Sequence, residues 1–260
     1  MTYTDHSPYK KWGQNFISDA NILRKIIQRI NPQPDDYFVE IGPGKGALTR
    51  YLLEKAKHVH AIEIDERLIP ELERIASKHP NFSWEIADFL KWEWPQYDHP
   101  IRLMGNIPYN ITSPLVILGF EHRDALQDVH FLMQKEVAQR LSAQHDGKSK
   151  EYGILSIFSQ IYGESIRLFD MSKNIFYPAP TVDSSVWHFI PNHALEISDE
   201  LDKHFRNIVR KSFGKRRKTL RNSLKDIIDE KDVPNFDFSL RPEKLSPQDF
   251  LQLAKDSFRP

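Results

Sequence analysis

The fold is decided by the stretch Val39-Glu40-Ile41-Gly42-Pro43-Gly44-Lys45-Gly46, which ends an apolar run and precedes a helix-like segment. Glycines at a strand-to-helix turn let the backbone bend sharply and approach a ligand without a Cβ in the way. Alone, the pattern predicts no more than a tight turn. It gains weight because Glu63 ends the next apolar run, 21 residues beyond Gly42, where a carboxylate can accept hydrogen bonds from ribose hydroxyls.

Apolar, β-branched runs alternate with amphipathic stretches over most of the chain. Expected strands are 37–41, 58–64, 82–86, 101–105, 129–134, 165–169 and 185–190, and expected helices between or before them are 21–30, 48–56, 68–78 and 135–142. Strands that alternate with helices pair in parallel through right-handed crossovers. Only the last two strands lack a helix between them. We therefore predict an α/β fold with a seven-stranded, mostly parallel sheet that contains one antiparallel strand.

After Pro191 the strand signals end, and 200–211, 216–228 and 246–257 are expected as short helices. We place a domain boundary near 191–197. Residues 1–191 then form the α/β domain, and residues 192–260 form a small all-helical domain.

The chain has 260 residues, 40% of them hydrophobic, so it can bury a sizeable core. It has no cysteine, which excludes disulfides, thiolate zinc sites, iron–sulfur clusters and cysteine nucleophiles. The 11 histidines show no clustered ligand pattern, so we expect no metal. No apolar run reaches the roughly 18 residues of a membrane span, and the N-terminus lacks a secretory pattern, so we expect a cytoplasmic protein without membrane contact.

Charge is distributed unevenly, although 36 basic residues balance 36 acidic ones. Ten basic residues and no acidic one lie between Lys203 and Lys225, which leaves 26 basic against 36 acidic residues elsewhere. Such a run can be a solvated helix face, but like charges without counter-charges repel one another, which favours contact with a polyanion. The residues expected to make this contact are Lys211, Lys215, Arg216, Arg217, Lys218 and Arg221.

A further acidic residue, Asp88, follows the third expected strand. The carboxyl ends of parallel strands meet at one edge of a sheet, and dinucleotides and S-adenosylmethionine both bind there. The turn lacks the dinucleotide pattern Gly-x-Gly-x-x-Gly, because its third glycine comes one residue early. Glu40 would lie badly beside a pyrophosphate but suits a ligand with a cationic sulfonium and an amino group. The sequence therefore favours S-adenosylmethionine, with S-adenosylhomocysteine as product.

The fourth expected strand runs into Met104-Gly105-Asn106-Ile107-Pro108-Tyr109-Asn110. Asparagine and proline often only end a strand, but downstream of the glycine turn they favour methylation of an exocyclic amine. The amino nitrogen of adenine is a poor nucleophile because its lone pair is delocalised into the ring. If the Asn106 side-chain oxygen and a carbonyl at Ile107 or Pro108 accept its two hydrogens, the lone pair becomes available. Tyr109 can stack on the base, a contact worth roughly 1–3 kcal/mol, so the reaction needs positioning rather than a general base.

The sequence resembles the ribosomal RNA adenine dimethyltransferases, and within that family the branch that modifies the small ribosomal subunit. The resemblance covers nearly the whole chain and rests on five stretches: Lys11-Trp12-Gly13-Gln14-Asn15-Phe16, Glu40 to Gly46, Gly105 to Asn110, Phe176-Tyr177-Pro178-Ala179-Pro180-Thr181-Val182-Asp183-Ser184 and Arg216-Arg217-Lys218-Thr219-Leu220-Arg221-Asn222-Ser223-Leu224. The last stretch separates this branch from relatives that methylate large-subunit RNA and confer macrolide resistance. Trp12, Ile17 and Ile107 depart from commoner residues but stay apolar.

The resemblance implies a Rossmann-like class I methyltransferase fold in residues 1–191 and an RNA-contacting helical domain in residues 192–260. It implies that the segment with Asn15 and Ile17 closes over the cofactor, and that Phe176 lies on the opposite face of the target adenine from Tyr109. The implied cofactor-binding residues are Asn15, Ile17, Gly42, Gly44, Glu63, Asp88 and Asn106. The implied catalytic residues are Asn106, Pro108, Tyr109 and Phe176.

Members of this family transfer two methyl groups to each of two adjacent adenines in a hairpin near the 3′ end of small-subunit (16S) ribosomal RNA, on a nearly assembled subunit. The implied partner is therefore the small subunit. No heptads or extended apolar face are evident, so we expect a monomer without an obligate protein partner. Two hypotheses stay open beside this one: an adenine or glutamine amino-methyltransferase acting on DNA or protein, and a non-catalytic RNA-binding assembly checkpoint.

Overall fold

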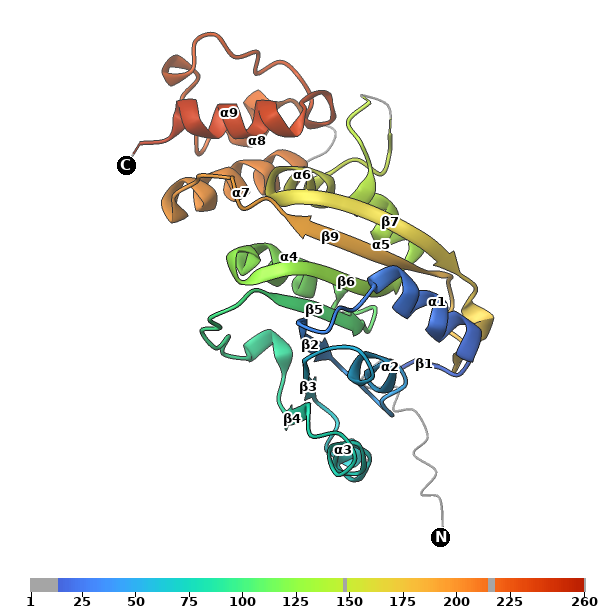
Figure 1. The fold of residues 1–260 in the computed structure, drawn as a ribbon. Helices are drawn as coiled ribbons and strands as arrows, with labels where there is room; N and C mark the ends of the chain where they lie inside the picture. Colours follow the sequence, from blue (N-terminus) through green and yellow to red (C-terminus); the bar gives the residue numbers. More distant parts are fainter. Residues whose placement is uncertain (1–13, 147–148, 215–217, 260) are drawn as a thin grey trace. The chain divides into compact units, whose positions relative to one another are not determined.

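The computed structural model describes residues 14–146, 149–214 and 218–259 (Figure 1). The strands are β1 (Phe16–Ile17), β2 (Tyr37–Ile41), β3 (His58–Glu63), β4 (Phe82–Ile86), β5 (Ile101–Asn106), β6 (Leu126–Gln134), β7 (Gly163–Met171), β8 (Phe176–Tyr177) and β9 (Ser184–Pro191). The α-helices are α1 (Ala20–Ile30), α2 (Thr49–Leu53), α3 (Ile69–Ala76), α4 (Thr112–Glu121), α5 (Lys135–Ser142), α6 (Ile154–Tyr162), α7 (Asp199–Gly214), α8 (Leu220–Leu224) and α9 (Pro247–Ser257). Short 3-10 helices are Glu66–Leu68, Phe89–Lys91, Arg123–Ala125, Lys173–Ile175, Glu230–Asp232 and Pro242–Lys244.

Two compact units make up the chain, the first from residues 1–138 and 166–191 and the second from residues 139–165 and 192–260. The second unit also takes in the segment 139–165, so the predicted division into residues 1–191 and 192–260 stays a prediction. The assignment of residues 1–191 to methyl transfer and of residues 192–260 to RNA contact remains a proposal. No helix in the described part of the chain has the length and apolar character to cross a membrane.

The first unit is built on a seven-stranded sheet with the order β4-β3-β2-β5-β6-β9-β7. The five strands from β4 to β6 pair in parallel, and β9 pairs with β6 antiparallel. In Figure 1 the arrows of β9 and β7 also point in opposite directions. This arrangement confirms the predicted α/β fold with its mostly parallel, Rossmann-like sheet and one antiparallel strand. Because β2 lies in the middle of the five parallel strands, the glycine turn that follows it lies at the middle of their shared carboxyl edge.

One face of this sheet is covered by helices whose apolar stripes share a single core. In α1 the buried residues Leu23, Ile26, Ile27 and Ile30 recur at the spacing of one helix face. They pack in the same cluster as residues of α2, α3, β2 and β5. Each fully buried Leu or Ile contributes about 1.5–3 kcal/mol relative to an exposed position, so this cluster fixes the strands that carry the site.

The second unit is helical, with α7 in contact with α8 and α9, and α6 in contact with α7 and α9. Its core includes Phe205 and Phe250, both fully buried. A buried polar group crosses it, since the Tyr162 hydroxyl donates to Asp202 at 2.6 Å and Asp202 also pairs with Arg206 at 2.8 Å. Within the described residues, the helix expected over 216–228 forms only as α8 (Leu220–Leu224).

Candidate active site

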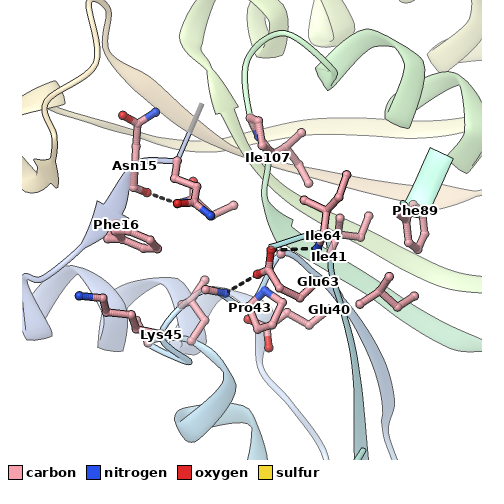
Figure 2. A pocket seen from close by; sticks show the side chains of 18 of the residues that line it. Asn15, Phe16, Glu40, Ile41, Pro43, Lys45, Glu63, Ile64, Phe89 and Ile107 are labelled. Atoms are coloured by element: carbon pink, nitrogen blue, oxygen red, sulfur yellow. Dashed lines mark hydrogen bonds between the residues drawn. The ribbon is translucent and has the colours of Figure 1, made fainter. Parts of the chain in front are cut away.

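A cavity of about 350 Å³ opens at the carboxyl edge of the sheet in the first unit (Figure 2). Every residue expected to bind the cofactor lines it: Asn15, Ile17, Gly42, Gly44, Glu63, Asp88 and Asn106. Pro108 also lines it. The parallel registers produce this convergence, because Ile41 lies beside both Ile62 and Gly105, so the chain leaves β2, β3 and β5 at nearly the same level.

The glycine turn has a backbone that other residues rarely adopt. Gly42, Gly44 and Gly46 have φ angles of +62°, +58° and +73°. A Cβ on Gly44 would also lie 2.8 Å from the Phe16 ring. The turn therefore needs glycine for two reasons: all three positions have a positive φ, and at Gly44 the Phe16 ring of the N-terminal segment lies too close for a side chain.

Glu63 ends β3 with its carboxylate buried beneath this turn. It accepts hydrogen bonds from the backbone N–H groups of Gly44 at 3.1 Å and Ile64 at 2.9 Å (Figure 2). A third hydrogen bond comes from the backbone N–H of Asp65 at 3.0 Å. Burial raises the pKa of Glu63, and the three N–H donors oppose that rise. A carboxylate has about four acceptor positions, so Glu63 keeps capacity for a hydroxyl donor in the cavity.

Glu40 is the most unusual group in the cavity wall. It is 2% exposed, and its Oε2 atom has no hydrogen-bond partner within the described structure. Burial raises the pKa of Glu40 to about 7; an interaction with Thr49 lowers it, and the nearby Glu63 raises it further. An unpaired buried carboxyl facing a cavity is costly unless a bound cation compensates it. This supports the sequence argument that Glu40 suits a ligand with positive charge.

Asp88 caps the short helix Phe89–Lys91 and lines the cavity at the end of β4. Its Oδ1 atom accepts a hydrogen bond from the Leu90 N–H at 3.1 Å. The cap fixes the carboxylate at the cavity wall and leaves Oδ2 for a ligand donor.

The N-terminal segment crosses the cavity and is held from three sides. Gln14 donates to Asp65 at 3.0 Å, and β1 pairs with β8 antiparallel, with Phe16 opposite Tyr177 and Ile17 opposite Phe176. The third contact joins the segment to Asn106. Sequence patterns did not reveal β1 or β8, because each has only two residues.

Asn106 ends β5, and the structure orients its carboxamide. Its Nδ2 atom donates to the main-chain oxygen of Asn15 at 2.7 Å (Figure 2). A carbonyl oxygen can only accept, so the NH₂ group must face Asn15 and the Oδ1 atom must face the other way. The carbonyl of Pro108 is occupied by the Ile111 N–H at 3.1 Å and the Thr112 hydroxyl at 3.2 Å.

The Ile107 carbonyl has no hydrogen-bond partner within the described residues. Of the two carbonyls that the sequence left open, Ile107 therefore offers the free acceptor, although Pro108 was the residue expected in the catalytic group.

The two aromatic residues expected to hold a base do not line the cavity. Tyr109 is half-buried, and its hydroxyl shares a hydrogen bond of 2.8 Å with Ser184; burial raises the pKa of Tyr109 and the contact with Ser184 lowers it. Phe176 is 5% exposed and packs in the core cluster under the cavity. The aromatic ring that reaches the cavity from β8 is its neighbour Tyr177, which is 69% exposed. The motif over 176–184 contains Tyr177, but the expected role was given to Phe176, because only strand alternation at β8 separates the directions of the two side chains.

The residues expected to bind RNA lie in the second unit. Lys211 and Lys218 are exposed. Arg221 pairs with Glu230 at 2.8 Å, and Arg206 in the same basic run pairs with Asp202. The run therefore has counter-charges at both ends, contrary to the argument that it lacks them. Lys215, Arg216 and Arg217 lie outside the described residues, as do Lys11, Trp12 and Gly13 of the N-terminal motif.

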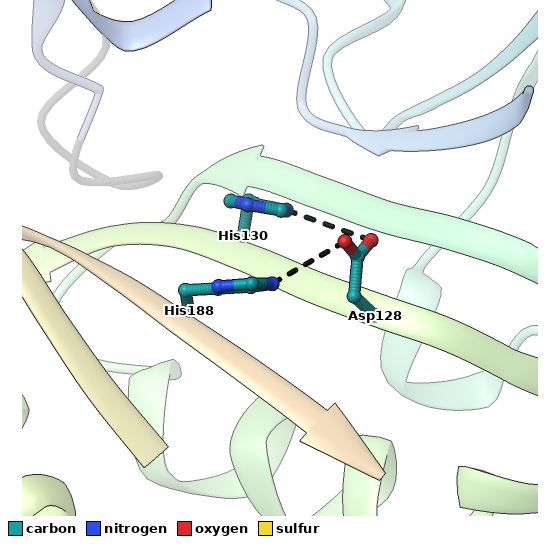
Figure 3. Close-up of side chains that lie close together, drawn as sticks. All are labelled: Asp128, His130 and His188. Carbon is teal, nitrogen blue, oxygen red and sulfur yellow. Dashed lines mark hydrogen bonds and ion pairs between the residues drawn. The ribbon is translucent and has the colours of Figure 1, made fainter. Parts of the chain in front are cut away.

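One group of side chains in the described residues has the composition of a metal site: Asp128, His130 and His188 (Figure 3). Its geometry favours an ion-pair network centred on Asp128 instead, in which the two ring nitrogens of buried His130 have no hydrogen-bond partner among the described residues. Arg102 donates to both oxygens of Asp128, at 2.9 and 2.8 Å, and His188 approaches the same carboxylate at 3.3 Å. The two imidazoles are stacked 4.1 Å apart at 15°, so their lone pairs lie in nearly parallel planes and do not converge on one ion. The expectation of no metal remains a prediction.

Comparison with known proteins identifies the family. The family described as Ribosomal RNA adenine dimethylase matches residues 6–256. A protein of Legionella pneumophila (strain Corby) named Ribosomal RNA small subunit methyltransferase A is 40% identical over 252 residues, which are 96% of this chain and 98% of that protein. A dimethyladenosine transferase from Plasmodium falciparum superposes with a TM-score of 0.78 at 28% identity, covering 92% of this chain and 95% of that one.

The 23S rRNA methyltransferase ErmE superposes with a TM-score of 0.72 at 25% identity, covering 94% of this chain and 99% of that one. The family match and the full-length relatives agree. The chain belongs to the ribosomal RNA adenine dimethylase family.

Proposed function

We propose that this chain is an S-adenosylmethionine-dependent methyltransferase that dimethylates the N6 amines of adenosines in small-subunit ribosomal RNA. Its targets are two adjacent adenosines in the 3′-terminal hairpin loop of 16S rRNA, modified late in the assembly of the 30S subunit. Family membership and the names of the full-length relatives support the reaction and the substrate class. The observation that carries the mechanism is the orientation of Asn106, whose NH₂ group is held by Asn15 and whose Oδ1 is free.

The cavity fits S-adenosylmethionine because its donors and acceptors match that molecule. The glycine turn leaves open space at Gly42 for a close-lying ligand, Glu63 can accept from ribose hydroxyls, and Asp88 can accept from an adenine amino group. The unpaired Oε2 of Glu40 provides negative charge for a cationic ligand. When bound, S-adenosylmethionine supplies an electrophilic methyl group.

Asn106 and Ile107 prepare the amine for attack. The Asn106 Oδ1 and the Ile107 carbonyl accept the two hydrogens of the adenine N6, which withdraws the nitrogen lone pair from the ring. Both acceptors are preorganised, Asn106 by the Asn15 carbonyl and Ile107 by its own N–H, which donates to Leu132 at 2.9 Å. Preorganised dipoles avoid reorganisation during the reaction, which is the main catalytic contribution available to this site.

Tyr109 and Phe176 are proposed to hold the target base from opposite faces. Phe176 is covered in this structure, so this role requires its ring to turn out of the core when the base enters. Drawing a base out of a structured RNA costs a few kcal/mol, least in a loop, and stacking offsets part of that cost. Lys211, Lys218 and the other basic residues of the second unit would supply salt-dependent phosphate contacts without reading sequence.

The test is transfer of labelled methyl groups from S-adenosylmethionine to small subunits from a strain that lacks this modification. We expect about four methyls per subunit, recovered as dimethyladenosine, because two adenines each receive two. Asn106→Ala should abolish transfer. Asn21→Ala, which removes an exposed carboxamide from α1, should leave it unchanged.

Large subunits, duplex DNA and protein serve as control acceptors. If one of them is labelled and small subunits are not, the substrate of this chain is that acceptor and not small-subunit RNA. Binding of RNA and cofactor without label on any acceptor would favour the non-catalytic checkpoint hypothesis.

A further inference from the structure

The rim of the cofactor cavity carries an exposed aromatic ring that the proposed mechanism does not use. Tyr177 is the most exposed of the large hydrophobic side chains in the described residues, at 69%, and it lines the cavity together with Asn106. Its backbone is held by pairing with Phe16, so the ring stands on a hydrogen-bonded ribbon rather than on a free loop. A large ring kept in solvent at the mouth of a site is available to stack on a ligand.

A free positive charge lies at the same rim. Lys45, exposed in the glycine turn, places its Nζ 5.7 Å from the centroid of the Phe16 ring, and Phe16 is the partner of Tyr177 (Figure 2). Lys45 makes no ion pair with any described residue. Together Tyr177, Phe16 and Lys45 present an aromatic surface beside an ammonium group, the combination that binds single-stranded nucleotides.

We propose that Tyr177 and Lys45 form a second nucleotide subsite, which holds the nucleotide next to the target adenosine. The base of that nucleotide stacks on Tyr177 and its phosphate contacts Lys45. The inference rests on the proposed function, because it requires an RNA strand entering this cavity. The rim position decides the occupant. The target base must reach Asn106 inside the cavity, whereas Tyr177 is too exposed to enclose it and is placed for a base next to the target.

The subsite is tested by kinetics of methyl transfer to undermethylated small subunits. Loss of one base–aromatic stack lowers affinity by about tenfold, so Tyr177→Ala should raise KM for small subunits by about that factor, with kcat nearly unchanged. Tyr177→Phe should restore the wild-type KM, because the stacking face is retained. Val182→Ala removes an exposed apolar side chain from the same loop that does not line the cavity, and should have no effect.

Lys45→Ala should raise KM and flatten its dependence on salt by about 0.7 in the log–log slope, the amount for one phosphate contact with a single strand. Lys57→Ala is the matched control, since Lys57 also lies over an aromatic ring, that of Tyr37, but does not line the cavity. A fall in the affinity for S-adenosylmethionine in either rim variant, measured by calorimetry, would assign the rim to the cofactor instead and overturn the proposal. So would unchanged KM values in both.

A direct binding measurement separates this proposal from the proposed function. A hairpin oligonucleotide with 2-aminopurine beside the target adenosine should lose fluorescence on binding to the wild type and not to Tyr177→Ala. If wild-type protein fails to methylate small subunits, the proposed function is wrong, and the quenching still decides whether the rim holds a base. Equal quenching by wild type and Tyr177→Ala would overturn the subsite alone.

Discussion

Replacement of Glu40 by glutamine should reverse a specific electrostatic cost in the first unit. Glu40 is buried without a partner for Oε2, and its pKa is raised from 4.5 to about 7. For a carboxyl whose pKa is higher in the folded state, stability is fully present below the unfolded pKa and is lost as pH rises through the folded value. The rise of the Glu40 pKa from 4.5 to about 7 therefore costs the folded state about 3 kcal/mol of stability. This loss begins near pH 4.5 and is complete above pH 7.

Glutamine at this position does not ionise, so Glu40→Gln should not show this loss. The free energy of unfolding is measured by urea denaturation without ligand, for both proteins at pH 4.5 and at pH 8. The value for the variant minus the value for wild type should be about 3 kcal/mol larger at pH 8 than at pH 4.5. Glu54→Gln, which removes an exposed carboxyl from the end of α2, is the control and should show no such change. A difference between wild type and Glu40→Gln that is the same at both pH values would refute the reasoning.

The same substitution should have the opposite effect on the ligand complex. A cationic cofactor stabilises the ionised carboxylate, so S-adenosylmethionine should bind wild type more tightly than Glu40→Gln at pH 8. The advantage should shrink as Glu40 becomes protonated below pH 7. Calorimetric titration at pH 6 and pH 8 measures it, and equal affinities of the two proteins at pH 8 would show that Glu40 does not face the cation.

Three further changes have expected outcomes. Gly44→Ala should weaken binding of S-adenosylmethionine at least tenfold by calorimetry, because the added Cβ meets the Phe16 ring at 2.8 Å and φ is +58°. Burial lowers the pKa of His130, so as pH falls below about 6.5 the unfolded chain binds a proton that the folded chain does not, and wild type loses stability. His130→Gln removes this group, so its melting temperature should fall less on acidification than that of wild type. Arg102→Met should destabilise the fold by about 3–5 kcal/mol in urea, because it leaves the buried Asp36 and Asp128 carboxylates without their shared cation, which pairs with them at 2.6 and 2.8 Å.

Elements with a clear period or clear ends could be predicted from the sequence. The strand over 37–41 and the helix over 135–142 have the bounds expected of them. Helix α4 (Thr112–Glu121) was not expected, because it is apolar on nearly all sides and has no amphipathic period. Helix α6 (Ile154–Tyr162) was missed for a related reason, since six of its nine residues are buried and its β-branched residues resemble a strand.

That the residues expected to bind the cofactor line one cavity was predictable, because their positions follow from chain geometry alone. In a parallel sheet, an acid or a glycine placed just after each strand must arrive at the same edge, whatever the surrounding side chains are. The directions of side chains at that edge were not predictable in the same way. Phe176 and Tyr177 are neighbours in sequence, and only the pairing of β8 with β1 turns one into the core and the other to the cavity rim.

The N-terminal segment shows why such details matter for the chemistry. The carbonyl of Asn15 holds the carboxamide of Asn106, while Asn15 and Ile17 line the cavity for the cofactor and β1 is paired with β8 beside the proposed base site. One short segment, residues 15–17, therefore lies beside the groups proposed for the methyl donor, the amine and the flanking nucleotide. Because these contacts are made by the same backbone, a ligand that orders the segment at any one of them also lowers the entropic cost of ordering it at the others. Cofactor and RNA should thus bind with positive coupling, even though they contact different side chains.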